Sequence, residues 1–504
     1  MRRIGPLLAL VLASACTSHE THPSVTESAE SRAHREKGLA LLASAESAPV
    51  PSEALASALD ELSKAVELAA TPANRFAHAR VALLVVPDDK DARKELAACL
   101  EDAPDDPSVL ALSAEVGAID GLGAGSTSDV DRAAERAEKA IALAAKGSAR
   151  EVRVFVGDQV YFAATCIQRR NPIQASKIVL GAAELGSPWA LSDQAKLLWL
   201  SRGAAFDRKK ALDAAEKGAL ATFTAEEMKR GLLYGTGAAN RRAARQLGHM
   251  LVEDADFERA YSWLDQGLAS KEDFFDAKGK PDPQAVVALA ERGAIDALEL
   301  GGHEGRKPRG LAELADAAEL GFTPALVLQA SLLKPEARGP LLARARDRGA
   351  PGAYALAGDF AGLVELASKD VAGARTERDR LEAQRLLFFA RAVDKGPEAR
   401  SVTEEEARSP VADVSRSTTA PLARQFLHMA GELPGEELAK EMPVSAHVPR
   451  WRSETGLALA TRCLLLGDRD GARGHLKNVV DALALFSVDY EVAFGAYFKL
   501  KESR

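Results

Sequence analysis

Small residues recur at one fixed spacing in three separate parts of this 504-residue chain. Gly248 is followed after twelve residues by Ala260, after four more by Leu264 and after three more by Gly267. The same separations join two further sets, which are Ala460, Ala472, Leu476 and Val479, and Ala163, Ala175, Val179 and Ala182. A twelve-residue step carries the chain out of one helix and into the next, and steps of four and three stay on one helix face. The spacing therefore predicts helix hairpins in which small side chains let two backbones approach closely.

Two of these segments resemble the two-helix unit of the tetratricopeptide repeat. They are QLGHMLVEDADFERAYSWLDQGLA, residues 246–269, and LLLGDRDGARGHLKNVV, residues 464–480. The resemblance implies an all-α fold, an α-solenoid of antiparallel helix hairpins that follows a right-handed superhelix. Aromatic residues make up only 5% of the chain and alanine dominates its apolar residues, which favours closely packed helices over strands.

The pentapeptide Ala-Ala-Glu-Leu-Gly occurs twice, at 182–186 and at 317–321, and each copy is followed four residues later by alanine. This pattern resembles the junction between Sel1-like repeats, where a helix ends at glycine and the next unit begins. Glycine readily adopts the left-handed backbone conformation that often ends a helix. The resemblance therefore implies five helix ends of one kind, at Gly186, Gly218, Gly293, Gly321 and Gly349.

The helical pattern is interrupted near 269–284, which we expect to be a long connection, and again at 403–422. We expect a repeat solenoid over 33–402, an irregular linker over 403–422, and a C-terminal helical repeat with a capping helix over 423–504. In the last helix, three rings share one face, namely Tyr490, Phe494 and Phe498. These rings either close the end of the core or dock a partner, and both interpretations stay open.

The N-terminus resembles the export signal of a bacterial lipoprotein. Arg2 and Arg3 precede an apolar stretch too short to cross a bilayer, and small residues follow directly before Cys16. The resemblance implies that residues 1–15 are a cleaved signal peptide and that Cys16 is lipidated and anchors the chain in a membrane. The alternative is ordinary secretory cleavage after Ala15, which leaves Cys16 as a free thiol.

The residue after Cys16 is Thr17 and not aspartate, which resembles the sorting pattern of outer-membrane lipoproteins. We therefore expect a periplasm-facing protein at the outer membrane, while the inner membrane and the cell surface stay open. Residues 16–32 are expected to form the lipidated end and a flexible tether. Three residues of this tether are of types that bind metal ions, namely His19, Glu20 and His22. A flexible segment supplies no preformed coordination geometry, so no metal site is predicted.

No local motif carries recognisable catalytic, cofactor-binding or metal-binding chemistry, and none of these sites is predicted. Glycines at 121–125 precede a helix where a phosphate could bind. Because no strand precedes them, we expect an inter-helix loop capped by Ser128 or Asp129. Residues 467–472 fill a hairpin turn and lack the later carboxylates of a calcium loop. The net charge of -8, without long basic runs, argues against a nucleic-acid partner.

Three cysteines occupy places that small apolar residues take in the repeats: Cys99, Cys166 and Cys463. We expect them to be buried and to form no disulfide framework.

Three functions remain. The first is a membrane-anchored, periplasm-facing scaffold that binds an envelope protein or peptide, which the signal, the tether and the repeats favour. The alternative is a protein that binds cell-wall glycan or another envelope ligand. The third is an enzyme with a cryptic site, because catalytic residues can be assembled from distant parts of a chain.

Overall fold

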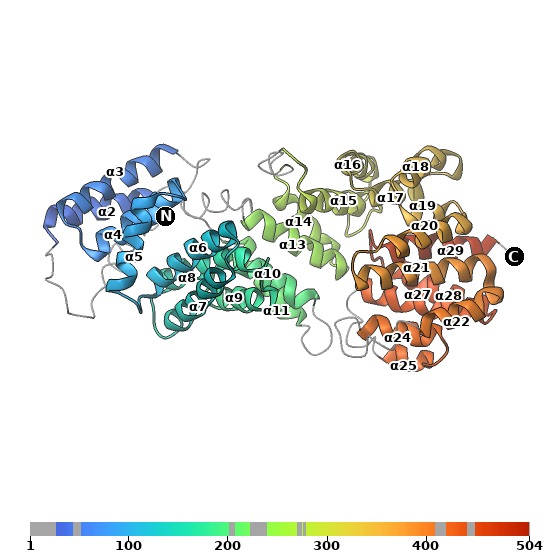
Figure 1. The fold of residues 1–504 in the computed structure, drawn as a ribbon. Coiled ribbons are helices and arrows are strands. Elements are labelled where there is room, and N and C mark those ends of the chain that lie inside the picture. Colours follow the sequence, from blue (N-terminus) through green and yellow to red (C-terminus); the bar gives the residue numbers. More distant parts are fainter. Residues whose placement is uncertain are drawn as a thin grey trace. The chain divides into compact units, whose positions relative to one another are not determined.

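The computed structural model describes residues 27–43, 52–200, 207–221, 239–269, 275, 279–408, 420–440 and 449–502. These residues form helices joined by turns and contain no β-strand, which confirms the all-α prediction. Within the described ranges, no helix is both long and apolar enough to cross a membrane. The helices fall into two compact units (Figure 1), and the boundary lies after Gln246, inside α13 (Ala239–Glu253).

The first unit contains, in order, α2 (Ala29–Ala43), α3 (Ser52–Leu68), α4 (Pro72–Val85), α5 (Lys90–Asp102), α6 (Pro107–Ala124), α7 (Thr127–Ala144), α8 (Arg150–Ile167), α9 (Pro172–Glu184), α10 (Pro188–Leu200) and α11 (Arg208–Ala219). The second contains α14 (Phe257–Gly267), α15 (Pro283–Ala297), α16 (Lys307–Glu319), α17 (Pro324–Leu332), α18 (Pro335–Asp347), α19 (Pro351–Leu356), α20 (Phe360–Gly373), α21 (Glu377–Lys395), η3 (Gly396–Ala399), α22 (Arg400–Arg408), α24 (Ala420–Met429), α25 (Gly435–Lys440), α27 (Pro449–Leu465), α28 (Arg469–Asp481) and α29 (Val488–Glu502). In both units helices that follow each other in sequence pack on each other, as in an α-solenoid.

Helices α4, α6, α9 and α15 begin in the same way. A short polar side chain accepts a hydrogen bond from a backbone N–H of the first turn, and proline follows it directly. The four capping residues are Thr71, Asp106, Asn171 and Asp282. Proline suits the first helical position because its missing N–H would have no partner there. The caps therefore fix where each helix begins and how short the preceding turn can be.

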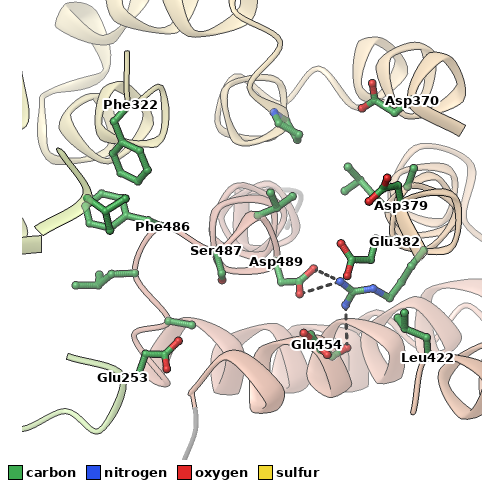
Figure 2. A pocket seen from close by; sticks show the side chains of 18 of the residues that line it. Glu253, Phe322, Asp370, Asp379, Glu382, Leu422, Glu454, Phe486, Ser487 and Asp489 are labelled. Atoms are coloured by element: carbon green, nitrogen blue, oxygen red, sulfur yellow. Dashed lines mark hydrogen bonds and ion pairs between the residues drawn. The ribbon is translucent and has the colours of Figure 1, made fainter. Parts of the chain in front are cut away.

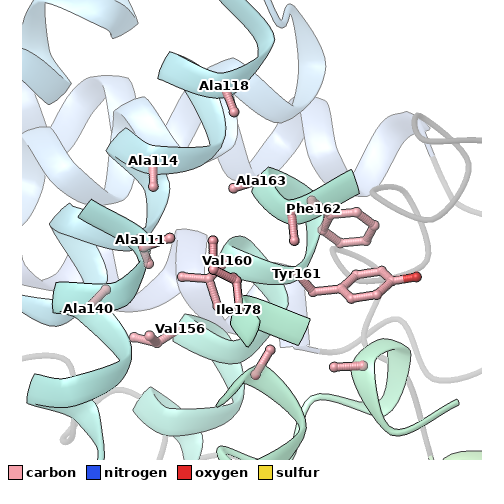
Figure 3. Packing of buried hydrophobic residues seen from close by; sticks show 14 of the residues in the cluster. Ala111, Ala114, Ala118, Ala140, Val156, Val160, Tyr161, Phe162, Ala163 and Ile178 are labelled. Carbon is pink, nitrogen blue, oxygen red and sulfur yellow. The ribbon is translucent and has the colours of Figure 1, made fainter. Parts of the chain in front are cut away.

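The three sets of regularly spaced small residues lie where helix pairs cross, which confirms the predicted hairpins. In the pair α13 and α14, a Cβ placed on Gly248 would lie 2.6 Å from Leu264 Cγ. Ala260 and Leu264 are fully buried in the same pair. The corresponding residues of α27 and α28 are fully buried as well, namely Ala460, Ala472, Leu476 and Val479. In the first unit, Ala163 of α8 and Ala175 and Ala182 of α9 are buried in one core, against which Val179 packs. Figure 3 shows Ala163 in this core.

The two copies of Ala-Ala-Glu-Leu-Gly are helix ends with the same hydrogen bonds. Gly186 and Gly321 both have positive φ, 95° and 102°. The residue after each glycine donates its N–H to the carbonyl oxygen of the first alanine of the copy. The distance is 3.1 Å from Ser187 to Ala182 and 3.0 Å from Phe322 to Ala317. Gly349, with φ 74°, ends α18 in the same way. The prediction is confirmed at these three glycines.

The same prediction was wrong for Gly218 and Gly293, which lie inside α11 and α15. A Cβ on Gly293 would lie 3.0 Å from the carbonyl oxygen of Gly310 in α16, and a Cβ on Gly310 would overlap the backbone nitrogen of Ala297. At this crossing glycine is required because two helix backbones touch.

Two expected segment limits differ from the structure. Helix α2 begins at Ala29, inside the expected tether, because Ser31 is buried and donates a hydrogen bond to the carbonyl oxygen of Ala65 at 2.8 Å. The expected linker 403–422 is helical at 403–408, where Glu404 accepts hydrogen bonds from Arg400 and Arg462, and helix α24 begins again at Ala420. Residues 409–419 lie outside the described residues. Helices from both sides of this segment pack within the second unit, so it does not divide two domains.

Six helices of the second unit close into a ring. Helices α19, α20, α21, α27 and α28 pack in succession, and α29 packs on both α28 and α19 (Figure 1). All six contribute to one apolar core. The closing contact is tight, because a Cβ on Gly495 in α29 would lie 2.5 Å from the carbonyl oxygen of Ala355 in α19. Helix α29 therefore turns back onto an earlier helix, where an open solenoid would extend outward.

The expected aromatic face of the last helix is present. The ring of Phe494 lies 6.1 Å from Tyr490 and 4.8 Å from Phe498 between centroids. Tyr490 is buried, whereas the side chain of Phe498 is exposed. This face runs from the core to the surface.

Candidate functional site

The expected lipidation site, Cys16, and the three tether residues His19, Glu20 and His22 lie outside the described residues. Among the residues that the structure describes, no group of histidine, cysteine, aspartate and glutamate side chains is arranged to hold a metal ion. The candidate site therefore has to come from the folded units.

An open cavity of about 720 Å³ lies in the second unit (Figure 2). Its walls come from helices that are far apart in sequence, namely α13, α15, α19, α20, α21, α24, α27 and α29, and from the turns before α17 and α29. Its volume is in the range typical of ligand-binding sites. A second cavity, between α2, α4, α5 and α6 of the first unit, has a volume of about 30 Å³.

Carboxylates dominate the polar lining of this cavity. They are Glu253, Glu291, Asp370, Asp379, Glu382, Glu454 and Asp489. Lys369 and Arg385 are the permanently cationic side chains of the lining. Partial burial raises the pKa of the Asp370 carboxyl. An excess of carboxylates in a partly enclosed space gives a negative potential that attracts cations.

Arg385 and Asp489 form a buried ion pair at the cavity wall. The guanidinium nitrogen Nη2 of Arg385 lies 2.9 Å and 3.0 Å from the two carboxylate oxygens of Asp489. Arg385 Nη1 also donates to the backbone carbonyl oxygen of Glu454 at 3.4 Å, as Figure 2 shows. This pair joins α21 to α29 and neutralises one of the lining carboxylates.

A second polar contact joins α13 to α15. His249 Nδ1 lies 2.5 Å from Glu291 Oε1, and His249 Nε2 lies 3.7 Å from Glu253 Oε1. The Glu291 side chain is buried, and its other oxygen, Oε2, has no hydrogen-bond partner among the described residues. A buried carboxylate oxygen of this kind loses hydration without a replacement.

The apolar side of the cavity is built by a strained turn. Leu483 and Phe486 have positive φ, 51° and 62°, although neither is glycine. The turn is held by hydrogen bonds from the N–H of Leu485 to Leu483 and from the N–H of Ser487 to Ala484. It places the ring of Phe486 edge to face against Phe322, with centroids 5.2 Å apart. Strain of this size is retained where the surrounding contacts fix the backbone.

The lining offers binding groups and no assembled nucleophile. Ser487 is the one hydroxyl-bearing residue of the lining in the part of the chain that the structure describes. Its Oγ accepts a hydrogen bond from the N–H of Tyr490 at 3.1 Å, which caps α29. His249 faces two carboxylates. This set can hold a cation and an apolar group side by side.

A separate polar cluster between α14, α15 and α16 is already saturated. Asp296 is fully buried and receives a hydrogen bond from the Tyr261 hydroxyl at 3.4 Å. His303 Nδ1 lies 3.0 Å from the same carboxylate, and Arg309 Nε lies 3.6 Å from it. Burial, and then the nearby Asp296 charge, raises the pKa of Tyr261. This cluster stabilises the helix junction.

The other sequence candidates have structural roles. Ser126 caps α7 through the N–H of Asp129, so the predicted caps at Ser128 and Asp129 were wrong by two or three residues. Helix α6 runs to Ala124, and only Gly125 has the positive φ of a helix end. Asp468 caps α28 in the turn that resembled a calcium loop.

The three cysteines pack with apolar residues, but the expected full burial is found only for Cys99. Cys99 is buried, whereas Cys166 and Cys463 are partly buried against the cores of their units. None of the three forms a disulfide. Burial raises the pKa of the Cys166 and Cys463 thiols, which lowers their reactivity.

The cavity itself was not predicted from the sequence. Two weak signals pointed toward it. Phe322 directly follows the joint glycine Gly321, and Phe486 belongs to the aromatic C-terminal segment.

No protein-family model and no curated protein matches this sequence. Among solved structures, the chain is similar to yeast Tom70, at 14% identity and a TM-score of 0.24, over 94% of this chain and 96% of that chain. It is also similar to the P58(IPK) TPR domain, at 14% identity and a TM-score of 0.16, over 94% of this chain and 99% of that chain. A third similarity is to Naa15/Naa10 bound to HypK-THB, at 12% identity and a TM-score of 0.18, over 94% and 86% of the two chains. At such low TM-scores these similarities carry no weight for the fold, which rests on the helix packing described above.

Proposed function

We propose that this protein is a membrane-anchored helical-repeat scaffold that binds a segment of another protein in the cavity of its second unit. The cavity is the observation that carries this proposal, since it combines about 720 Å³ of space with a carboxylate wall and an apolar wall. Helical-repeat proteins use the surfaces between stacked hairpins to hold other chains. The lining supplies polar and apolar contacts without an assembled catalytic group, which favours binding over catalysis.

The anchoring half of the proposal rests on the N-terminal sequence. A cationic start, a short apolar stretch and small residues directly before Cys16 resemble a lipoprotein signal. Several acyl chains on one cysteine are sufficient for stable membrane attachment. In this proposal the polar residues 17–28 tether the helical units to the membrane, on the periplasmic side of the outer membrane.

Anchoring is tested by Cys16→Ser in a bacterial host. The unsubstituted protein should incorporate a labelled fatty acid and sediment with membranes, and the variant should do neither. Cys463→Ser is the matched control, because it removes a partly buried thiol elsewhere and should leave labelling unchanged. Unlabelled, soluble unsubstituted protein would instead support ordinary secretory cleavage. Membrane density fractionation then tells the outer membrane from the inner one.

Binding in the cavity is tested by photocrosslinking in intact cells. A photoreactive residue at Val287 in the cavity wall should capture one recurring partner. The same residue at Glu365, which is exposed on α20 and outside the lining, should not capture it. Identical products from both positions would contradict the proposal. Co-sedimentation with purified peptidoglycan that depends on cavity residues would support the glycan-binding alternative.

A further inference from the structure

We infer that the occupant of the cavity is a cationic amphipathic segment of a partner protein, with lysine or arginine at the carboxylate wall and an apolar side chain against Phe322 and Phe486. This inference rests on the proposed binding role of the cavity and specifies the chemistry of its partner. Figure 2 shows Phe322 and Phe486 on one side of the cavity, with Glu253 near them, and Asp370, Asp379 and Glu382 on the other side.

The charge of the lining favours a partner with positive charge. Among the described residues, the lining holds seven carboxylates and two permanent cations, and Arg385 is paired with Asp489. Glu382 also accepts a hydrogen bond from Arg378 at 2.9 Å, but this arginine is exposed and lies outside the lining. An anionic or apolar side chain would desolvate these carboxylates without replacing their hydrogen bonds, and a neutral amide would replace hydrogen bonds but not balance the charge. A cationic side chain supplies both the charge and the donors.

The carboxylate of Glu291 gives independent evidence for a missing donor. Other buried carboxylates of the second unit differ in this respect, because Glu313 is saturated by arginine whereas Oε1 of Glu491 also has no hydrogen-bond partner among the described residues. Both oxygens of Glu313 receive hydrogen bonds from Arg292, and Arg309 adds a third. Glu291 lines the cavity and only 3% of it is exposed, yet its Oε2 has no hydrogen-bond partner among the described residues. A donor brought by a ligand would complete this site.

The apolar wall selects a peptide over a small cation. Val287, Leu483 and Leu485 add apolar side chains to the lining beside the two phenylalanine rings. A polyamine would leave this wall covered only by water, whereas an amphipathic segment buries an apolar side chain there and presents its cations to the other wall.

Binding of defined peptides to the purified full-length protein in detergent tests the inference. The probe is a fluorescein-labelled peptide of alternating lysine and leucine residues with one central phenylalanine. Two matched peptides carry glutamine or glutamate in place of every lysine. By fluorescence anisotropy, we expect the lysine peptide to bind about tenfold more tightly than the glutamine peptide and the glutamate peptide not to bind. Binding of the lysine peptide should weaken as salt is raised from about 50 mM to about 500 mM.

Variants locate the binding. The double variant Glu253→Gln, Glu382→Gln should bind the lysine peptide about tenfold more weakly and bind the glutamine peptide with unchanged affinity. Phe486→Ala should lower the affinity for both peptides. Glu365→Gln, on the exposed face of α20, should change the affinity for neither. A single cooperative thermal unfolding transition above the assay temperature in every variant shows that each is folded.

The outcomes separate this inference from the proposed function. Equal binding of lysine and glutamine peptides, with Phe486→Ala weakening both, would keep the cavity as the binding site and overturn the cationic partner. No binding of the lysine peptide at about 1 mM would also overturn it, even if crosslinking at Val287 still captures a protein. Displacement of the lysine peptide by soluble peptidoglycan fragments would favour a glycan occupant and overturn both.

Discussion

The rings of Phe322 and Phe486 meet edge to face, with centroids 5.2 Å apart and planes inclined by 70°. Phe322 follows the glycine that ends α16, and Phe486 lies in the strained turn before α29. One contact therefore links a repeat joint to the turn that forms the apolar wall of the cavity.

The coupling between these rings can be measured. Aromatic pairs in this geometry contribute about 0.5–1.5 kcal/mol beyond their buried area. In a cycle of Phe322→Ala, Phe486→Ala and the double variant, we expect a coupling free energy of unfolding in that range, measured by urea denaturation. Strictly additive effects would show that the rings do not support each other.

The ion pair between Arg385 and Asp489 should be costly to break from one side. Both residues are buried, so Asp489→Asn leaves a buried guanidinium without its counter-charge. We expect a loss of about 3–5 kcal/mol in the free energy of unfolding. The double variant Arg385→Met, Asp489→Leu removes both charges and should lose less than the single variant. A double variant that is less stable than Asp489→Asn would contradict this account.

Glu491 should make the second unit less stable as pH rises. Its carboxylate packs on Gly352 of α19, and its Oε1 has no hydrogen-bond partner among the described residues. Burial raises its pKa from 4.5 to about 8, so the folded state holds a proton that the unfolded state releases. This stabilisation is complete below pH 4.5 and is lost as pH rises to about 8. Across this pH range the free energy of unfolding should fall by up to about 5 kcal/mol.

The variant Glu491→Gln provides the comparison for that effect. It keeps the shape of the side chain but cannot ionise, so the decline in unfolding free energy between pH 5 and pH 8 should flatten. Hydrogen exchange of the α29 amides should then become less dependent on pH than in the unsubstituted protein, after correction for the intrinsic exchange rate. Glu365→Gln, at an exposed position, should leave the decline unchanged. Equal slopes for Glu491→Gln and the unsubstituted protein would exclude Glu491 as the source.

The crossing of α15 and α16 should not tolerate a side chain at Gly310. A Cβ there would overlap the backbone nitrogen of Ala297, and backbone cannot move aside as a flexible side chain can. We expect Gly310→Ala to lower the free energy of unfolding by about 2–3 kcal/mol. Gly474→Ala is the matched control, because this helical glycine of α28 has open space around it and alanine should stabilise it by about 0.5–1 kcal/mol. A neutral Gly310→Ala variant would show that the helices can separate.

Local patterns were sufficient to predict the hairpins, because the twelve, four and three spacing depends only on residues within one helix pair. They were not sufficient to predict the role of Gly293, because the residues around it resemble the sequence of a helix end. Its role depends on Gly310 of the next helix, and only the packed pair shows that two backbones touch there.

The cavity was beyond prediction for a similar reason. Its carboxylates lie on helices as far apart as α13 and α29, and the ring that brings α29 back to α19 leaves no periodic signal in the sequence. In the sequence, residues such as Asp379 and Glu382 cannot be told from the charged residues of an ordinary solvent-exposed helix face. Lipidation of Cys16, the membrane and the partner stay predictions that the proposed experiments address.

The ring closed by α29 also bears on how such a chain can change during evolution. A stack of hairpins ends in a face on which one more hairpin can be added by duplication, with little disturbance to the others. A ring in which α29 already packs on α19 has no such face, so an inserted hairpin would have to separate Gly495 from Ala355. We therefore expect relatives to gain and lose hairpins only outside the six ring helices, for example among α22, α24 and α25, while the number of helices in the ring stays constant.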